Sequence, residues 1–252
     1  MTNEKKPFEA RLSEAKLLKQ SMDAIAQLIN ECSINITKDG LELKAMDSAN
    51  VSMVDYRLLC TAFESYKVAE PQTIGLSMND FTQILKRAKP NESLDMSLED
   101  NRLEISIGGK RRFVIPLLDV AGSTTKTPNL SFKTSIELKT DAFEEALADA
   151  EIVSDAMVFE AEKDKFTMLA TGDGRKVEIK MDKDSPEVIA LECTEKSRAM
   201  FPLEYLKKII KGAKITESTK IELGNDYPLR ITSEIKDQTR ISFVLAPRIE
   251  ND

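Results

Sequence analysis

The sequence contains no His and no Trp, only three Cys, and no long apolar run. Without His, every mechanism that needs an imidazole as base, acid or metal ligand is excluded. Cys32, Cys60 and Cys193 are too few and too scattered for a disulfide framework, and they form no CxxC pair. We therefore expect reduced thiols that pack as small core residues.

Membrane and secretory segments are also missing. No stretch approaches the ~18 consecutive apolar residues of a membrane span. Residues 1–6 are charged and lack the apolar core of a secretory signal. Together with the reduced cysteines, these features predict a cytoplasmic protein that has no membrane partner.

The chain is acidic overall, with 36 Lys and Arg against 43 Asp and Glu and a formal net charge of −7. Taken as a whole, an acidic chain argues against a nucleic-acid partner. The 252 residues allow one large domain or two domains of about 125 residues each. Either arrangement can bury a core without disulfide or metal support.

The two halves of the chain repeat one pattern at a spacing of 125 residues. Residues 78–89 align with residues 203–214, through the pairs Phe81/Leu206, Ile84/Ile209, Leu85/Ile210 and Ala88/Ala213. The same spacing relates residues 39–45 to residues 164–170, which have the alternation of strands. Because one spacing relates helix-like and strand-like segments alike, we predict a duplicated fold.

Each half contains two helical patterns. Apolar residues spaced three and four apart predict helices over residues 13–30, 79–89, 141–151 and 203–213. Ser77 is the expected cap of the second helix, and Pro202 is the expected first residue of the fourth. Asp141 and Glu144 have the spacing of a capping box at the start of the third helix.

Short strands with period-two alternation outnumber the helices, which favours an antiparallel α+β fold. Asp39-Gly40 predicts a tight hairpin turn between two of these strands. The polar segment 119–131 has neither helical nor strand periodicity and indicates a linker. We therefore expect an N-terminal domain over residues 1–118 and a C-terminal domain over residues 132–252.

Positive charge is concentrated on two of the predicted helices. These equivalent helices of the two halves carry Lys86, Arg87 and Lys89 in the first and Lys207, Lys208, Lys211 and Lys214 in the second. A single basic helix is usually an ordinary solvated face. Two equivalent basic helices make a surface that opposes phosphates an equal alternative to a solvated face, and such a surface would bind nucleic acid without reading its sequence.

No motif in the sequence points to catalysis. Asp39, Asp47, Asp173 and Asp182 are the carboxylates that a magnesium site would have to combine. Asp39 and Asp173 stand beside Gly in predicted turns, where Asp is favoured for local hydrogen bonding. The segment 171–174 lacks the Lys-Ser/Thr and the glycine spacing of a phosphate loop. We therefore expect no catalytic residue, no metal and no cofactor, and a protein that is not an enzyme.

These features together resemble the DNA polymerase sliding clamps of the PCNA family, most of all the archaeal ones. The resemblance runs nearly end to end and is most specific in Leu28–Glu31, Leu43–Val51, Ser154–Asp155 and Leu245–Glu250. It implies a homotrimeric ring whose subunits each have two tandem copies of the DNA-clamp fold, with antiparallel sheets outside and two helices per domain inside. It also implies a ring without catalytic activity that encircles double-stranded DNA, in the cytoplasm at the nucleoid of an archaeal cell. Such a ring tethers DNA polymerase, flap endonuclease and DNA ligase during replication and repair, and a clamp loader opens it.

The resemblance also assigns residues by matched position. The set facing DNA would comprise Lys16, Lys19, Lys86, Arg87, Lys207, Lys208, Lys211 and Lys214. The pocket for partner peptides would comprise Met46, Asn50, Val51, Pro228, Val244, Ala246, Pro247 and Ile249. The seam between subunits would pair Arg111, Arg112, Phe113, Val114 and Ile115 of one subunit with Arg175, Lys176, Val177 and Ile179 of the next.

Three features depart from this family pattern. The predicted helix 141–151 is acidic where many clamps have Arg or Lys, through Asp141, Glu144, Glu145, Asp149 and Glu151. Ser123 and Thr125 replace apolar residues of the linker, and Ala26 and Gln83 stand where relatives often have Lys. One subunit of a heterotrimeric ring is therefore an alternative to the homotrimer. A two-domain metal-dependent hydrolase and an interaction scaffold unrelated to DNA are the alternatives from other classes.

Overall fold

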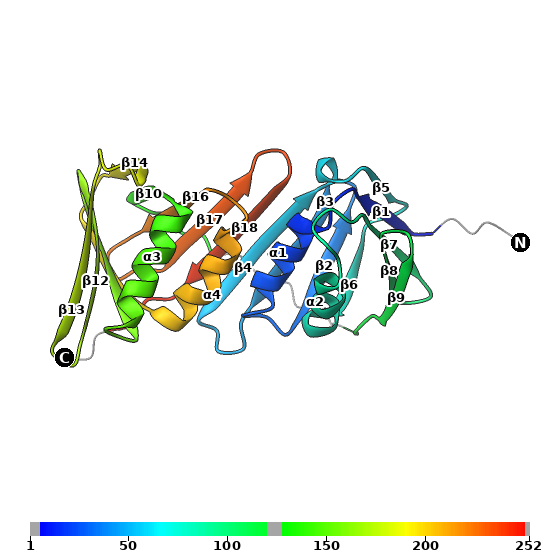
Figure 1. Cartoon of the computed structure of the whole chain (residues 1–252), viewed down its shortest axis with the longest axis horizontal. Coiled ribbons are helices and arrows are strands. Elements are labelled where there is room, and N and C mark those ends of the chain that lie inside the picture. Colours follow the sequence, from blue (N-terminus) through cyan, green and yellow to red (C-terminus); the bar gives the residue numbers. More distant parts are fainter. Residues whose placement is uncertain (1–5, 120–127, 250–252) are drawn as a thin grey trace, which may run out of the picture. The chain divides into compact units, whose positions relative to one another are not determined.

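The structure is a computed structural model that describes residues 6–119 and 128–249 (Figure 1). The chain divides into two compact units, of which the first comprises Met1–Met46, Val54–Thr127 and Glu234–Arg240, and the second Asp47–Met53, Pro128–Ser233 and Ile241–Asp252. Each unit thus includes a short segment from the other half of the sequence. The predicted linker 119–131 lies mostly outside the described residues, so the domain bounds remain a prediction.

Within residues 6–119, the N-terminal half forms nine strands and two α-helices. An antiparallel sheet has the order β5-β1-β7-β8-β9, from Ser65–Val68, Phe8–Leu12, Leu94–Glu99, Arg102–Ile107 and Arg111–Pro116. Four further strands follow one another as β4-β3-β2-β6, from Ser52–Leu59, Gly40–Met46, Glu31–Thr37 and Gln72–Ser77. The helices are α1 (Lys16–Ile25) and α2 (Met78–Lys86), and a short 3-10 helix, η1 (Cys60–Ala62), follows β4.

The C-terminal half has the same elements in the same order. An antiparallel set runs β14-β10-β16-β17-β18, from Val188–Cys193, Thr134–Lys139, Ser218–Leu223, Leu229–Ile235 and Thr239–Leu245. A second antiparallel sheet runs β13-β12-β11-β15, from Arg175–Asp182, Lys165–Gly172, Ala156–Glu162 and Ser197–Pro202. The helices are α3 (Thr140–Glu151) and α4 (Leu203–Ala213).

The two halves therefore match strand for strand, which confirms the predicted α+β fold of two tandem copies. The elements β2 and β11, β6 and β15, and α2 and α4 each begin 125 residues apart, which is the spacing of the sequence repeat. The predicted hairpin at Asp39-Gly40 joins β2 to β3. Gly40 is required there because its φ is +143° and a Cβ atom would lie 2.1 Å from the carbonyl oxygen of Leu58.

The helix ends differ in part from the predictions. Ser77 caps α2 as expected, since its hydroxyl accepts a hydrogen bond of 3.3 Å from the backbone N–H of Asp80. Pro202 is the N-cap of α4, one position before the predicted one. α1 covers less than residues 13–30, because the amides of Gln27 and Leu28 turn to carbonyls three residues back.

The predicted capping box of α3 is wrong. The N-cap is Lys139, without a side-chain cap bond, so Asp141 already lies within the first turn. Glu144 instead forms an ion pair of 2.6 Å with Lys214. The Glu144 carboxylate, which the local pattern assigned to the helix start, thus pairs with a lysine that is distant in the sequence.

Each half has its own apolar core beneath its helices. In the C-terminal half, the buried ring of Phe159 contacts the rings of Phe143, Phe166 and Phe201 at centroid distances of 6.0, 5.7 and 5.6 Å. Burying one such side chain contributes on the order of 2 kcal/mol. This core fixes α3 against β11, β12 and β15, and with it the charged face that α3 presents.

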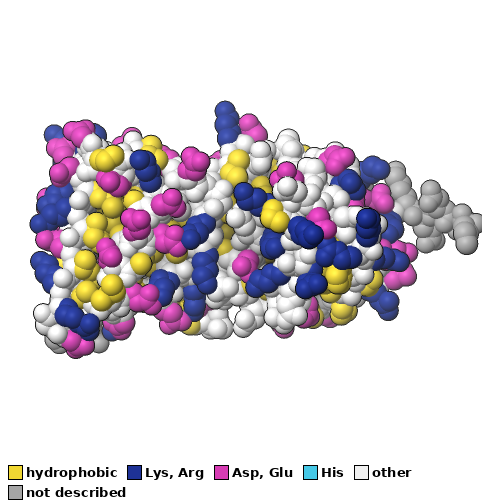
Figure 2. Space-filling view, in the orientation of Figure 1, with side chains coloured by type: hydrophobic (Ala, Val, Ile, Leu, Met, Phe, Trp, Pro, Cys, Tyr) yellow, Lys and Arg dark blue, Asp and Glu magenta, His cyan; other side chains and the backbone are white. Residues whose placement is uncertain are grey.

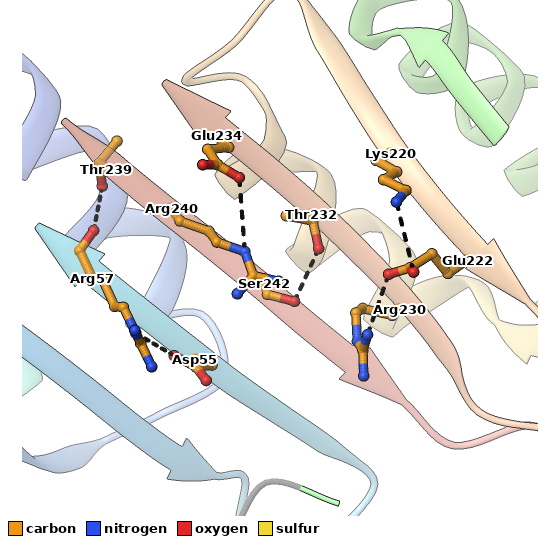
Figure 3. Close-up of polar contacts among 10 residues, drawn as sticks. All are labelled: Asp55, Arg57, Lys220, Glu222, Arg230, Thr232, Glu234, Thr239, Arg240 and Ser242. Carbon is orange, nitrogen blue, oxygen red and sulfur yellow. Dashed lines mark hydrogen bonds and ion pairs between the residues drawn. The ribbon is translucent and has the colours of Figure 1, made fainter. Parts of the chain in front are cut away.

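The strands behind α4 carry polar pairs on their other face (Figure 3). The hydroxyl groups of Thr232 and Ser242 lie 3.0 Å apart, and Arg230 forms an ion pair of 3.4 Å with Glu222. The neighbouring Ser233 points the opposite way, because its hydroxyl reaches the carbonyl oxygen of Ala213 at the end of α4. This alternation gives each strand one face toward the helices and one toward solvent.

Candidate functional site

The exposed face of α4 is basic. Leu206, Ile209 and Ile210 are buried, whereas Lys207, Lys208 and Lys211 lie on the opposite side of the helix. Figure 2 shows Lys and Arg side chains gathered over α1, α2 and α4, and Asp and Glu side chains over α3. Each unit thus presents basic side chains on its helices, and in the second unit acidic groups lie beside them.

Carboxylates hold three of the α4 lysines. Lys207 forms an ion pair with Glu151, and Lys214 lies 2.6 Å from Glu144, both on α3. Lys208 forms an ion pair of 2.6 Å with Glu204 one turn earlier, and its ammonium lies 5.3 Å from the centre of the Tyr205 ring. These pairs are partly exposed, so each contributes little to stability and can exchange its carboxylate for another anion.

Ion pairs with α4 account for part of the acidic charge on helix α3. Asp141, Glu145 and Asp149 are exposed, while Glu144 and Glu151 reach toward α4. The helix therefore lowers the net positive charge of its neighbour. The sequence pattern alone does not reveal this pairing, because the partners lie on different helices.

The helices of the N-terminal half present their basic residues differently. Lys86 forms an ion pair of 2.8 Å with Asp23 of α1. The ammonium of Lys19 donates to the carbonyl oxygens of Ala88 and Lys86, at 2.9 and 3.3 Å. These carbonyls belong to the C-terminal end of α2, where a cation is favoured by the helix dipole. Lys19 therefore has a structural role in addition to the predicted one.

The remaining predicted DNA residues are surface groups. Lys16 is exposed at the start of α1, and Arg87 is exposed just past the end of α2. The carbonyl oxygen of Arg87 accepts a hydrogen bond of 2.8 Å from the guanidinium of Arg111. That bond ties the end of α2 to β9, one of the two predicted seam strands.

One buried carboxylate organises the segment 47–53, which is the loop between β3 and β4 together with the first two residues of β4 and is called the loop 47–53 below. Asp47 accepts hydrogen bonds from the backbone N–H groups of Ser52, Val51 and Ala49, at 2.6, 2.8 and 3.2 Å. Asn50 has a φ of +57°, in the left-handed region that Asn tolerates. Burial disfavours the charged form, yet the hydrogen bonds from Ser52, Tyr205 and Val51 outweigh it and lower the pKa of Asp47.

The C-terminal tail runs beside this loop. The N–H of Ala246 donates to the carbonyl oxygen of Val51 at 2.9 Å, which brings together two residues of the predicted peptide pocket. The N–H of Arg248 donates to the carbonyl oxygen of Met200 at 2.7 Å, and its guanidinium pairs with Asp155 at 2.9 Å. The tail is thus fixed on both sides by backbone hydrogen bonds.

Most of the predicted pocket residues belong to the second unit, whereas Met46 belongs to the first. Val244, Ala246, Pro247 and Pro228 are half-buried, and the exposed fractions of Met46 and Ile249 are 39% and 82%. The predicted polar linker residues, Ser123 and Thr125, lie outside the described residues. The first described anchor after the linker is Phe132, whose ring stacks under the guanidinium of Arg230 at 4.8 Å and against Tyr227 at 5.8 Å.

A groove that the sequence does not reveal borders the tail in the second unit. Its volume is about 420 Å³, and its apolar lining includes Val158, Leu169, Met200 and Ile249. The ion pair between Asp155 and Arg248 lies at the same groove. The sequence resemblance singles out Ser154–Asp155 and the tail, but it does not reveal a groove, because the other lining residues come from three separate strands.

The two predicted seam strands both have an unpaired edge. Among the described strands, β9 is hydrogen-bonded to β8 alone and β13 to β12 alone. On β9, Val114 is exposed by 46%, Arg111 pairs with Glu92 at 2.5 Å, and Arg112 pairs with Glu104. On β13, the predicted seam residues Arg175, Lys176, Val177 and Ile179 are exposed or half-buried. An unpaired edge strand is a template for pairing with another chain.

Nothing in the described chain has the form of a metal centre: residues 6–119 and 128–249 hold no group of three or more Cys, Asp or Glu placed to bind an ion. Asp173 lies in the turn before β13 with a φ of +48°, and Asp39 lies in the β2–β3 hairpin, as expected from their turn chemistry. None of the described helices is long and apolar enough to cross a membrane.

In the comparison with known proteins, both halves of the chain match domains of one family. Residues 7–108 match the N-terminal domain of proliferating cell nuclear antigen, and residues 126–248 match its C-terminal domain. The DNA polymerase sliding clamps of Pyrococcus furiosus and Thermococcus gammatolerans are 34% and 36% identical to the chain over 247 residues, which is 97% of this chain and 99% of each relative.

Solved structures agree with this similarity. A structure of PCNA from Thermococcus kodakaraensis has a TM-score of 0.90 and 25% identity, and covers 96% of this chain and 100% of that one. A. fulgidus PCNA, in a structure with the C-terminal region of FEN-1 bound, has a TM-score of 0.88 and 28% identity, and covers 97% and 100%. With both halves matched and relatives similar over nearly the whole length, the chain belongs to the proliferating cell nuclear antigen family.

Proposed function

We infer that the protein is a sliding clamp: a ring of three subunits that encircles double-stranded DNA and tethers DNA polymerase, flap endonuclease and DNA ligase to it. It acts in replication and repair, without catalysis of its own, in the cytoplasm at the DNA. The observation that carries this function is the pair of unpaired edges on β9 and β13, because the duplicated fold supplies a partner for each.

The internal repeat shows how such edges pair. β18 is the equivalent of β9, and β4 is the equivalent of β13. Within the first unit, the hydroxyl of Thr239 on β18 donates to the carbonyl oxygen of Arg57 on β4 at 2.7 Å (Figure 3). Within the second unit, the N–H of Ala246 after β18 donates to Val51 before β4. The equivalents of the two free edges are thus neighbours.

The same pairing between subunits is our basis for the ring. If Arg111–Ile115 of one subunit pairs with Arg175–Ile179 of the next, every subunit uses its β9 edge for one neighbour and its β13 edge for the other. Such head-to-tail contacts form a closed ring when the rotation per subunit closes. Three subunits, the number typical of the family, would contribute six similar domains.

The basic helices would supply the hold on DNA. Lys16, Lys86, Arg87 and the α4 lysines contact phosphates without reading bases, which suits a ring that must slide. The net charge of −7 is then not decisive, because Lys and Arg side chains lie over the helices of each unit. Phosphate replaces the carboxylate at Lys207, Lys208 and Lys214 when DNA enters.

Partner peptides would dock at the loop 47–53 and the tail, where Val51 and Ile249 offer apolar surface. The A. fulgidus relative, solved with the C-terminal region of FEN-1 bound, supports a partner peptide as ligand, whereas the place of the pocket rests on the matched positions. The homotrimer is the first candidate, because one chain carries both edge strands of the proposed seam, β9 and β13. The acidic helix α3 keeps the heterotrimer as the second candidate, since other subunits would then supply charge.

Topology gives the decisive experiment. Loaded by its clamp loader, the ring stays on closed circular DNA and slides off linear DNA with open ends, and equal retention on both would rule out the clamp function. Changing Lys207, Lys208 and Lys211 to Glu together should abolish retention on circles. The matched control changes three exposed lysines in connections between strands, Lys38, Lys163 and Lys183, to Glu, which alters the net charge equally and should leave retention intact.

The subunit question has a separate readout. Light scattering on the purified chain distinguishes a homotrimer from a monomer that awaits other subunits. A stable trimer of the pure chain would eliminate the heterotrimer.

A further inference from the structure

The loop 47–53 depends on a contact with α4. Asp47 is only 7% exposed, and three backbone N–H groups of the loop converge on its carboxylate. The fourth donor comes from outside the loop: the hydroxyl of Tyr205 on α4 donates to Oδ2 of Asp47 at 2.9 Å. The two residues are 158 positions apart in the sequence and lie in the same compact unit.

The four donors are divided between the two carboxylate oxygens. Oδ1 accepts from Val51 and Ser52, and Oδ2 accepts from Ala49 and Tyr205. Without the Tyr205 hydroxyl, Oδ2 would keep a single bond, the 3.2 Å contact with Ala49. A buried carboxylate that loses a donor loses part of what offsets its desolvation. The carboxylate can then rotate toward water, and the backbone amides that it holds lose their fixed acceptor.

Tyr205 is itself held in place. It occupies the first turn of α4, which starts at Leu203, where the N–H of Leu203 donates to the carbonyl oxygen of Asp155 at 2.9 Å. The ammonium of Lys208 lies over its ring, which favours a fixed ring orientation. The hydroxyl is therefore presented to Asp47 by a helix whose buried Leu206, Ile209 and Ile210 anchor it in the core.

We propose that Tyr205 is a positioning residue for partner docking: through Asp47 it holds the loop 47–53 in the conformation that receives partner peptides. This role rests on the proposed peptide pocket, since Asn50 and Val51 belong to that loop. It also assigns to α4 a second task beside its basic face, because one turn of the same helix carries both Tyr205 and Lys208.

Tyr205→Phe is the direct test, because it keeps the ring and its contact with Lys208 and removes only the hydroxyl. We expect the amides of Ala49, Val51 and Ser52 to exchange with solvent roughly tenfold faster, the order that loss of one hydrogen bond to a carboxylate predicts. The dissociation constant for a C-terminal flap-endonuclease peptide should rise by a similar factor. Retention on circular DNA should not change, since no basic residue is lost.

Tyr66→Phe is the matched control. Its hydroxyl donates to the carbonyl oxygen of Thr37 at 2.9 Å in the first unit, so one buried tyrosine bond is lost there too. This variant should leave both loop exchange and peptide affinity as in the wild type. If the two Phe variants weaken the peptide equally, the effect is one of general stability and the proposal is overturned.

A double variant separates the role of the hydroxyl from that of the loop. Asp47→Asn should also speed exchange of the loop amides, and Tyr205→Phe should add little to it, because the two residues act through one bond. Unchanged loop exchange in Tyr205→Phe overturns the proposal, as does faster exchange with unchanged peptide affinity. If the wild type fails to bind the peptide, the proposed pocket fails, whereas the exchange rates still decide whether Tyr205 holds the loop.

Discussion

The ammonium of Lys214 lies 2.6 Å from the carboxylate of Glu144, which ties the end of α4 to the acidic helix α3. Glu151 forms the same kind of contact with Lys207 at the other end of α3. Both lysines are about half exposed, at 46% and 43% of the side chain, so solvent and phosphate can compete with the carboxylates. In the proposed clamp, helix α3 would therefore compete with DNA for Lys207 and Lys214.

The double variant Glu144→Gln with Glu151→Gln should bind DNA more tightly. Removing both carboxylates leaves Lys207 and Lys214 available to phosphates, so we expect affinity on the order of tenfold higher at low salt and a salt dependence of log K steeper by about 2. Fluorescence anisotropy of a labelled duplex over a salt titration measures both quantities.

Glu145→Gln is the control, because it removes one negative charge from the exposed side of the same helix without touching these two ion pairs. It should raise affinity far less and leave the salt slope nearly unchanged. Equal effects of the two sets would mean that α3 acts by overall charge and not by pairing.

Lys19 should matter for stability as well as for charge. Its ammonium donates to two carbonyl oxygens at the C-terminal end of α2. Lys19→Met keeps the apolar stem and removes these bonds, so the free energy of unfolding should fall by about 1 kcal/mol. Lys16→Met removes the same charge from the same helix and should cost less than about 0.5 kcal/mol. Urea unfolding measures the free energy lost in each variant, and similar losses would contradict the capping role of Lys19.

Asp47 should make the free energy of unfolding depend on pH. Its pKa in the folded protein is below the ordinary value of 3.8, so its contribution is fully present above that value and is lost as pH falls through the folded pKa. Asp47→Asn should therefore lower the unfolding free energy at about pH 7, and the deficit relative to wild type should shrink below about pH 4. Ser48→Ala, an exposed change in the same loop, should alter neither. A deficit that is constant with pH would show that the carboxylate charge is not involved.

The duplicated fold could be predicted from the sequence because one spacing of 125 residues relates helices and strands alike. Periodicity also placed the buried faces, such as Leu41, Leu43 and Ala45 on β3. Both kinds of signal are local or repeat at a fixed interval, and so they survive without knowledge of which elements touch.

Contacts between different helices and strands leave no periodic signal in the sequence. Lys19 and Ala88 are 69 positions apart, and Asp47 and Tyr205 are 158 apart, so neither pair follows from a period. The Asp141 capping pattern failed for the same reason, since Glu144 pairs across helices instead of along its own. Individual roles of charged residues thus depend on how helices pack, which their spacing does not encode.

The seam offers the sharpest structural prediction. Val114 is exposed by 46% on the unpaired edge strand β9, where the proposed ring places the next subunit's β13. Val114→Glu would bury a charge at that contact, so we expect the ring to dissociate to monomers with the fold intact. Light scattering gives the mass, and circular dichroism checks the fold.

Ile189 provides the matched comparison for this prediction, because it is exposed by 53% on β14, an edge strand that the proposed seam does not use. Ile189→Glu introduces the same charge at an equally exposed apolar position and should leave the trimer whole. If both variants stay trimeric, β9 is not the seam. If both dissociate, the ring closes through a larger surface than the β9–β13 pair, and the argument from the internal repeat fails.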